Sequence, residues 1–181
     1  MSNKILLNSE EVNKSITRIS HEILEKNKDS KQIALIGIRT GGALLASRLQ
    51  ARMKEITKQE IPLGLLDITL YRDDLSEVGP QPDVRETSIK FDVTGKIIIL
   101  VDDVLFTGRT IRCALDAIID FGRPECIQLA VLIDRGHREL PIKADYVGKN
   151  IPTSKQEEVV VNLNENSGKE EVTVRNREAK S

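Results

Sequence analysis

The spacing of apolar residues predicts a helix and then a buried strand at the start of the chain. Over residues 9–27, apolar side chains recur at intervals of three and four, which is typical of one face of an amphipathic helix. Ser9 is the expected cap of this helix, and Glu10 and Glu11 follow it in the first turn, where the helix dipole favours acidic groups. Ile33–Ile38 is a short apolar run without polar alternation, which predicts a strand that is buried on both sides.

Similar patterns continue along the chain and predict an α/β fold. We expect a helix over Ala43–Met53, strands over Leu63–Tyr71, Ile97–Val101 and Gln128–Ile133, a helix over Thr110–Phe121, and short strands at Val147, Val159–Leu163 and Val172–Val174. The order of strand, turn and helix favours a mostly parallel sheet flanked by helices. The polar, irregular stretch over about residues 71–92 predicts a flexible lid inserted into that core.

Length and composition indicate one ordinary globular domain. The chain has 181 residues, so residues 1–181 are expected to form one domain, with a charged tail over about 175–181 that frays. The net charge is −1, so any nucleic-acid surface must be a local patch. We expect Cys113 and Cys126 to be buried free thiols in a reducing compartment. Because no apolar run is long enough for a signal peptide or a membrane span, we expect a cytoplasmic protein without membrane association.

The most informative segment is an apolar strand that leads into two adjacent carboxylates and a glycine-containing turn. Asp102 and Asp103 follow the strand, and the turn Thr-Gly-Arg-Thr starts a helix a few residues later. Ligands of α/β sheets bind at the carboxyl ends of the strands, and the N–H groups of a helix start favour an anion. Gly108 allows close backbone approach, and Thr107 and Thr110 add hydroxyl donors. The segment therefore predicts a site for a ribose 5-phosphate group.

Other interpretations of this segment are weaker. Paired aspartates after a strand can simply cap the next helix, and for an isolated pair that interpretation is the better one. Here the strand, the glycine turn and both threonines stand in register with the pair. The chain lacks the Gly-x-x-x-x-Gly-Lys-Ser/Thr pattern of a P-loop and the Gly-x-Gly-x-x-Gly pattern of a dinucleotide site.

The same segment resembles a known signature. Val101–Thr110 is similar to the phosphoribosyl pyrophosphate (PRPP) signature of type I phosphoribosyltransferases. Four further segments resemble the pyrimidine operon regulator (PyrR) family, namely Thr17–Glu22, Asp67–Asp74, Asp134–Pro141 and Ala144–Ser154. The likeness covers nearly the whole chain and weakens over residues 76–90 and after about residue 162.

The resemblance implies a type I phosphoribosyltransferase fold with two activities. Members of the family convert uracil and PRPP to UMP and pyrophosphate, with Mg²⁺ bound through PRPP and water. They also bind the leader of pyrimidine operon mRNA when UMP is present, which promotes transcription attenuation. The implied partners are therefore PRPP, uracil, UMP and leader mRNA, and the implied assembly is a homodimer that can pair into a tetramer.

The resemblance also assigns roles around the sugar and phosphate groups. Asp102 and Asp103 are expected to hold the ribose hydroxyls, while Arg39 and the lid residue Arg72 are candidates to assist the leaving pyrophosphate. An arginine beside a loop is, however, often only a solvated charge. The expected substrate-binding positions are Thr40, Gly41, Gly42, Val104, Leu105, Phe106, Thr107, Gly108, Arg109 and Thr110.

Two positions distinguish this chain from relatives. Purine-using phosphoribosyltransferases typically carry an Asp at the position of Phe106, where it exchanges a proton with the purine ring, so Phe106 favours a pyrimidine. Many members of the PyrR family carry Arg at the position of Gly41, so one cationic contact to pyrophosphate is absent here. This difference bears on catalytic strength more than on nucleotide binding.

An RNA-binding surface is implied at positions that match the family's basic dimer surface. These positions are Thr17, Arg18, His21, Arg138, Lys143 and Lys149. Lysine and arginine supply phosphate contacts, while hydroxyl and imidazole groups can contact exposed bases. The competing interpretation is an ordinary solvated helix face and a charged strand edge. Three functions therefore remain: a bifunctional regulator, a uracil phosphoribosyltransferase without RNA binding, and an RNA regulator with little catalysis.

Overall fold

The computed structural model describes residues 4–28, 30–71, 86–163 and 169–176. Most of the predicted lid, and all but the first two residues of the predicted tail, lie outside these ranges. The main sheet is parallel, with strand order β3-β2-β4-β5-β6. Its strands are β2 (Ile33–Ile38), β3 (Leu63–Leu66), β4 (Ile97–Leu105), β5 (Cys126–Asp134) and β6 (Tyr146–Asn150).

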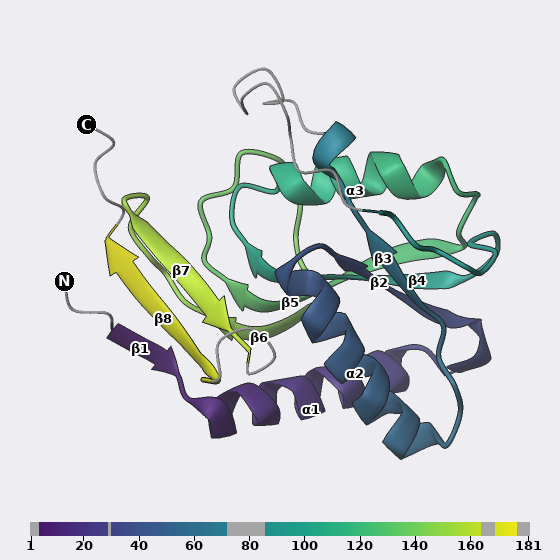
Figure 1. The fold of residues 1–181 in the computed structure, drawn as a ribbon, viewed down its shortest axis with the longest axis horizontal. Coiled ribbons are helices and arrows are strands. Elements are labelled where there is room, and N and C mark those ends of the chain that lie inside the picture. Colours follow the sequence, from purple (N-terminus) through teal and green to yellow (C-terminus); the bar gives the residue numbers. More distant parts are fainter. Residues whose placement is uncertain (1–3, 29, 72–85, 164–168, 177–181) are drawn as a thin grey trace.

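Helices cover both faces of the main sheet (Figure 1). Helices α1 (Ser9–Lys26) and α2 (Gly41–Thr57) lie on one face, and α3 (Arg109–Ile119) lies on the other. Two short 3₁₀ helices, η1 (Ser30–Gln32) and η2 (Thr69–Tyr71), complete this part. The predicted fold class, a mostly parallel sheet flanked by helices, is confirmed.

The central strands are buried because they contribute side chains to both layers. Successive residues of a strand point to opposite faces, so Leu35 and Ile99 pack with α1 and α2, whereas Ile36 and Leu100 pack with α3. Every residue of β2 is buried, as its unbroken apolar run predicts. The core therefore holds the carboxyl ends of adjacent parallel strands at one rigid edge.

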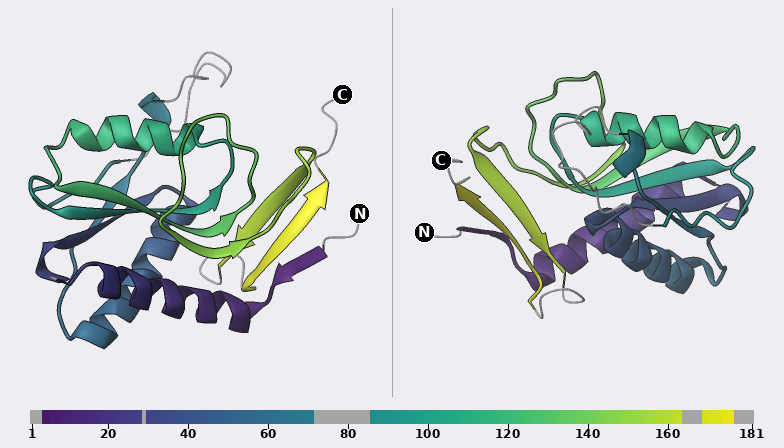
Figure 2. Two further views of the ribbon diagram at one scale, coloured as in Figure 1. Left: turned by 180° about the vertical axis from the view of Figure 1, so that it is seen from behind. Right: turned by 45° about the horizontal axis from the view of Figure 1, so that its top comes forward.

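A second, antiparallel sheet stands beside the main one, next to the start of α1 (Figure 2). Its strand order is β1-β8-β7, and its strands are β1 (Lys4–Leu7), β7 (Glu157–Asn162) and β8 (Glu171–Asn176). The sequence patterns predicted β7 and β8 as short strands but not β1. Leu7 and Val172 join the hydrophobic cluster of α1 and α2, which attaches this small sheet to the core.

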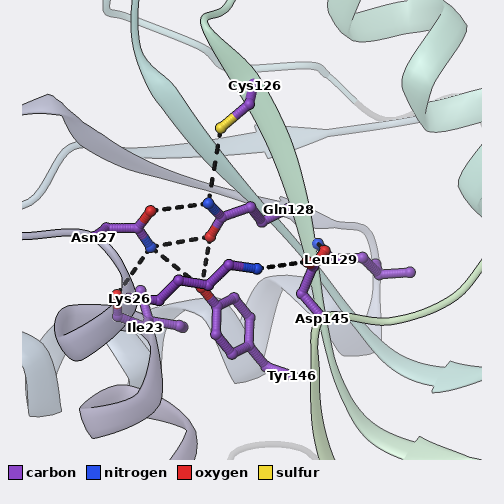
Figure 3. A network of polar contacts seen from close by, with 8 residues as sticks. All are labelled: Ile23, Lys26, Asn27, Cys126, Gln128, Leu129, Asp145 and Tyr146. Carbon is purple, nitrogen blue, oxygen red and sulfur yellow. Dashed lines mark hydrogen bonds and ion pairs between the residues drawn. The ribbon is translucent and has the colours of Figure 1, made fainter.

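A buried polar network fixes the end of α1 against β5 and β6 (Figure 3). The side-chain amides of Asn27 and Gln128 each donate to the other's oxygen, at 2.9 and 2.8 Å, and the Tyr146 hydroxyl donates to Gln128 at 2.5 Å. Beside this buried set, the exposed residues Lys26 and Asp145 form an ion pair at 2.8 Å. Because buried polar groups are costly without partners, this closed set favours one placement of α1.

The structure corrects several local predictions. Asn8, not Ser9, caps α1, because its side chain accepts from the Glu11 N–H at 3.0 Å while the Glu11 carboxylate accepts from the Asn8 N–H. The strand predicted over Leu63–Tyr71 ends at Leu66, and a 3₁₀ turn follows. Both cysteines are free thiols, but only Cys113 is buried, whereas Cys126 is exposed at the start of β5.

Candidate functional site

The candidate site begins where β2 ends beside the last residues of β4. Arg39–Gly42, here called the pyrophosphate loop, joins β2 to α2, and the Arg39 N–H donates to the Leu66 carbonyl at 2.9 Å. The Arg39–Thr40 peptide bond is cis. The strand predicted to end at Val101 continues to Leu105, so both aspartates belong to β4 itself. Parallel pairing therefore brings the pyrophosphate loop next to the carboxylates.

Two glycines allow the pyrophosphate loop to lie directly against β4. A Cβ atom at Gly42 would stand 2.4 Å from the Val101 carbonyl oxygen. A Cβ atom at Gly41 would stand 2.0 Å from Oδ2 of Asp103. Either contact is far shorter than van der Waals separation allows, so only glycine fits this arrangement without movement. The sequence predicted both groups of residues, and the structure brings them into contact.

The paired aspartates are electrostatically unusual. Asp102 is only 7% exposed, and its Oδ1 accepts from the Asp103 N–H at 3.0 Å. Asp103 Oδ1 accepts from the Val104 N–H at 2.8 Å. Burial, followed by the nearby Asp103 charge, raises the pKa of Asp102 well above its ordinary value, and burial raises the pKa of Asp103. Hydroxyl donors or a cation at this place would stabilise the charged forms.

The segment Thr107–Thr110, here called the phosphate turn, starts α3. Gly108 is the N-cap residue, with a φ of 93°, and no side chain caps the helix. The Thr107 hydroxyl accepts from the Arg109 N–H at 3.3 Å, and the Thr107 carbonyl accepts from the Glu139 N–H at 2.9 Å. Gly108 caps the helix without a side chain, and the binding of an anion by the N–H groups of this helix start stays a prediction.

An aromatic and cationic cluster, which the sequence patterns did not indicate, stands beside the phosphate turn. The Arg135 guanidinium lies 4.0 Å from the centre of the Phe106 ring, and the His137 ring meets Phe106 edge-on at 5.9 Å. Arg135 is buried and donates to the Ser154 and Glu157 carbonyls at 2.9 and 2.7 Å. The sequence does show an arginine directly after a buried strand, which could have indicated this cluster. The contacts of that arginine, however, depend on the second sheet.

The partners of Phe106 also line an open pocket. It lies between the segment after β5 and the segment after β6, and its wall includes Asp134, Gly136, His137, Ile151 and Thr153. The His137 ring nitrogen makes a close contact with the Thr153 carbonyl, which ties the two walls together. The pocket thus adjoins the phosphate turn through the Phe106 cluster.

Comparisons with known proteins agree with this arrangement. Residues 2–166 match the model of the phosphoribosyl transferase domain family. The chain is 59% identical to the bifunctional protein PyrR of Pelotomaculum thermopropionicum, with 93% of each chain covered. It is 57% identical to PyrR of Thermus thermophilus, with 96% of each covered. The chain belongs to the PyrR family of phosphoribosyltransferases.

Solved structures support the fold. A hypoxanthine phosphoribosyltransferase of Trypanosoma cruzi superposes with a TM-score of 0.72 at 20% identity, covering 97% of each chain. A point variant of hypoxanthine phosphoribosyltransferase from the same organism, in a ternary substrates complex, gives a TM-score of 0.75 at 21% identity, covering 94% of each chain. At this identity the likeness concerns the fold alone. No helix within the described ranges combines the length and apolar character of a membrane span.

The positions that resemble the RNA surface of the PyrR family lie around edge strand β6. Thr17, Arg18 and His21 belong to α1, on one face of the main sheet. Lys149 belongs to β6, and Lys143 follows Ile142, which packs in the cluster of α3 on the other face. The six candidates therefore wrap around one edge of the sheet, with Arg138 between β5 and β6.

Several of these candidates already have partners within the chain. Arg18 donates to the Val147 and Gly148 carbonyls at 3.1 and 2.5 Å, so it covers the free edge of β6. Lys149 donates to the Leu6 carbonyl at 3.1 Å. His21 is exposed on α1. Arg72 lies outside the described residues, and Arg39 has a buried Nε without a hydrogen-bond partner in the described part of the chain.

Proposed function

We propose that the chain is a bifunctional regulator of the PyrR type. It converts uracil and PRPP to UMP and pyrophosphate, and in the presence of UMP it binds the leader of pyrimidine operon mRNA to promote attenuation. The observation that carries this proposal is the meeting of the pyrophosphate loop with Asp102 and Asp103, in a chain 57–60% identical to proteins named bifunctional PyrR.

The proposed reaction asks the protein for positioning and charge stabilisation. The bond between the anomeric carbon and pyrophosphate breaks, uracil N1 bonds to that carbon, and the N1 proton passes to solvent. Asp102 and Asp103 hold the ribose hydroxyls, and the phosphate turn holds the 5′-phosphate. Arg39 is proposed to stabilise the charge that grows on pyrophosphate, and the resemblance assigns the same role to Arg72. Fixed donors of this kind act mainly by orientation and electrostatics.

The donor set fits Mg²⁺ that arrives with PRPP. Within the described ranges, no group of three or more His, Cys, Asp or Glu side chains could hold a metal ion alone. Two adjacent carboxylates with raised pKa values would nevertheless gain from a nearby cation. Mg²⁺ readily keeps water and substrate phosphates as ligands. When bound, it would neutralise charge on the leaving pyrophosphate.

The Phe106 cluster supports uracil as the base. The Arg135 guanidinium lies 4.0 Å from the centre of the Phe106 ring. Position 106 itself offers an apolar ring instead of a carboxylate that could exchange a proton with a purine. The adjoining pocket, lined by His137 and Thr153 among others, has room beside the phosphate turn for a base. We place uracil in this pocket.

The proposed RNA surface lies around β6. Thr17, His21 and Lys143 project from elements on the two sides of that strand, while Arg18 and Lys149 lie along its edge. Sequence-specific RNA recognition mostly targets single-stranded loops, bulges and ends, which fits a leader hairpin as the partner. We expect the chain to work in the cytoplasm, where nascent mRNA and PRPP are both available, as a homodimer that can pair into a tetramer.

Two assays test the proposal together. A gel-shift titration with a pyrimidine operon leader hairpin, at fixed salt and with or without UMP, should show tighter binding when UMP is present. The uracil-plus-PRPP assay should yield UMP and pyrophosphate. Absence of a shift in both conditions would leave a uracil phosphoribosyltransferase alone. A UMP-dependent shift without turnover would favour a regulator with little catalysis, the alternative that Gly41 suggests.

A further inference from the structure

Arg138 is committed to contacts inside the protein. One terminal guanidinium nitrogen donates to the Phe106 carbonyl at 2.8 Å and the Gly136 carbonyl at 3.2 Å. Nε donates to the Ile142 carbonyl at 2.8 Å, and the other terminal nitrogen pairs with Asp134 at 2.5 Å. The Arg138 side chain is only 23% exposed, and that of Asp134 is 15% exposed.

These contacts join two functional segments. Phe106 immediately precedes the phosphate turn, and Ile142 immediately precedes exposed Lys143. The rigid fork of an arginine can bridge several carbonyls and a carboxylate at once, which a lysine cannot reproduce. An RNA phosphate could recruit Arg138 only if these buried contacts were broken. Arg138 is therefore better placed to link the two segments than to touch RNA.

Further bonds between the same segments make them one unit. The Glu139 and Leu140 N–H groups both donate to the Thr107 carbonyl, at 2.9 and 3.3 Å. Arg109 Nε pairs with the Glu139 carboxylate at 2.6 Å across the same junction. A Cβ at Gly108 would lie 3.4 Å from side-chain atoms of Ile142, so the turn also packs against the Ile142 side chain. Movement of the phosphate turn must therefore be passed to the segment that leads to Lys143.

We propose that Arg138 is a positioning residue that couples nucleotide binding at the phosphate turn to RNA binding near Lys143. This inference rests on the proposed function. It adds a structural link between the UMP site and the RNA surface. When the 5′-phosphate of UMP binds and shifts the turn, Arg138 and its neighbours pass the shift to the backbone from Glu139 to Ile142. Lys143 is then held where it meets the RNA backbone.

The test compares Arg138→Lys, Arg138→Met and the control Lys143→Met with the unmodified full chain. RNA affinity is measured with and without UMP across a salt series, and the coupling is the ratio of the two dissociation constants. Both Arg138 variants should lose most of the coupling, while the salt slope of UMP-free binding stays unchanged. Lys143→Met should weaken binding mainly in the presence of UMP, where Lys143 is held against the RNA, and should reduce the salt slope measured with UMP by about one.

A different pattern would overturn the inference. If Arg138 contacts RNA phosphate, Arg138→Met will also weaken UMP-free binding and reduce its salt slope, and Arg138→Lys will keep both affinity and coupling. The effect of RNA on UMP affinity gives an independent measure, because coupling between two ligands is reciprocal. If the unmodified chain itself shows no UMP effect, the proposed function fails before any variant is compared.

Glu139→Gln provides a variant that leaves the Arg138 contacts in place. The Glu139 carboxylate is half exposed, so its loss should not prevent folding. This variant removes the ion pair with Arg109 and should lower the coupling by a smaller factor than Arg138→Lys. Full coupling in Glu139→Gln, together with full coupling in any folded Arg138 variant, would show that the junction does not transmit nucleotide binding.

Discussion

The carboxylate of Asp103 occupies the space that a side chain at Gly41 would need, since a Cβ at Gly41 would lie 2.0 Å from Asp103 Oδ2. The ribose-binding and pyrophosphate-binding parts of the proposed site are therefore in direct steric contact. Glycine at this position is what allows the pyrophosphate loop and β4 to approach so closely. The departure from the arginine of many PyrR-family members thus has a structural consequence.

Gly41→Ala should weaken PRPP use without unfolding the protein. The added methyl group must displace either Asp103 or the pyrophosphate loop, so we expect the KM for PRPP to rise by about tenfold. Steady-state kinetics with varied PRPP measure this change, and thermal unfolding verifies the fold. Ala51→Ser, on the exposed side of α2, is the matched control and should leave KM unchanged. An unaltered KM in Gly41→Ala would refute the steric argument.

Asp102→Asn should abolish most UMP synthesis and remove a pH dependence of stability. Burial and the Asp103 charge raise the pKa of Asp102 in the folded state, so the folded protein binds this proton more tightly than the unfolded chain. The stability from Asp102 is present at low pH and is lost as pH rises through the raised pKa. Activity should fall by about 100-fold, because a transition-state contact is removed.

Urea unfolding of ligand-free protein between about pH 5 and pH 8 tests the stability part of this prediction. The unmodified chain should lose stability relative to Asp102→Asn as pH increases. Parallel curves for the two proteins would mean that Asp102 does not carry a raised pKa. Addition of PRPP with Mg²⁺ should reduce the difference, because bound cations and hydroxyl donors favour the charged carboxylate.

Glu170→Gln should destabilise the attachment of the second sheet. The Glu170 side chain is 5% exposed and accepts hydrogen bonds from Ser9, Asn13 and Arg48. Burial raises its pKa, but these partners outweigh burial and lower it overall. The stability contribution is therefore present above the ordinary carboxyl pKa and lost as pH falls through the lowered value. We expect a loss of about 1–3 kcal/mol at neutral pH.

The urea midpoint at neutral pH measures the effect of Glu170→Gln. Glu10→Gln is the matched control, since Glu10 pairs with Lys14 at the surface with both side chains largely exposed. An exposed pair is screened by water and salt, so this control should leave the midpoint unchanged. Equal midpoints for the two variants would contradict the anchoring role of Glu170.

Phe106→Leu should weaken both stability and nucleotide binding. Leucine keeps an apolar side chain but lacks the ring face that lies 4.0 Å from buried Arg135. A desolvated cation–π contact contributes about 1–2 kcal/mol, and its loss should lower the free energy of unfolding by that amount. UMP affinity, measured by calorimetry, should fall as well. Phe121→Leu, which changes an exposed ring after α3, should affect neither quantity.

Local sequence determined the elements whose burial follows a simple period. The helix over 9–27 and the strand Ile33–Ile38 were predicted nearly to their observed ends, because one apolar face or two buried faces leave a clear pattern. The phosphate turn could also be predicted from the sequence, because Gly108 and two threonines lie within a few residues of one another. Local patterns did not place the cap at Asn8 instead of Ser9, because both residue types can accept the same N–H bond.

Only the tertiary structure decided the contacts between distant segments. The pairing of β1 with β8 and the meeting of Gly41 with Asp103 both join residues far apart in the chain. So do the contacts of Arg138 with Phe106 and of Arg135 with the second sheet. Composition and periodicity report whether a residue is buried, not which residue it will meet. The sequence thus determined the chemical groups of the site, and the packing of two sheets decided which of those groups act together.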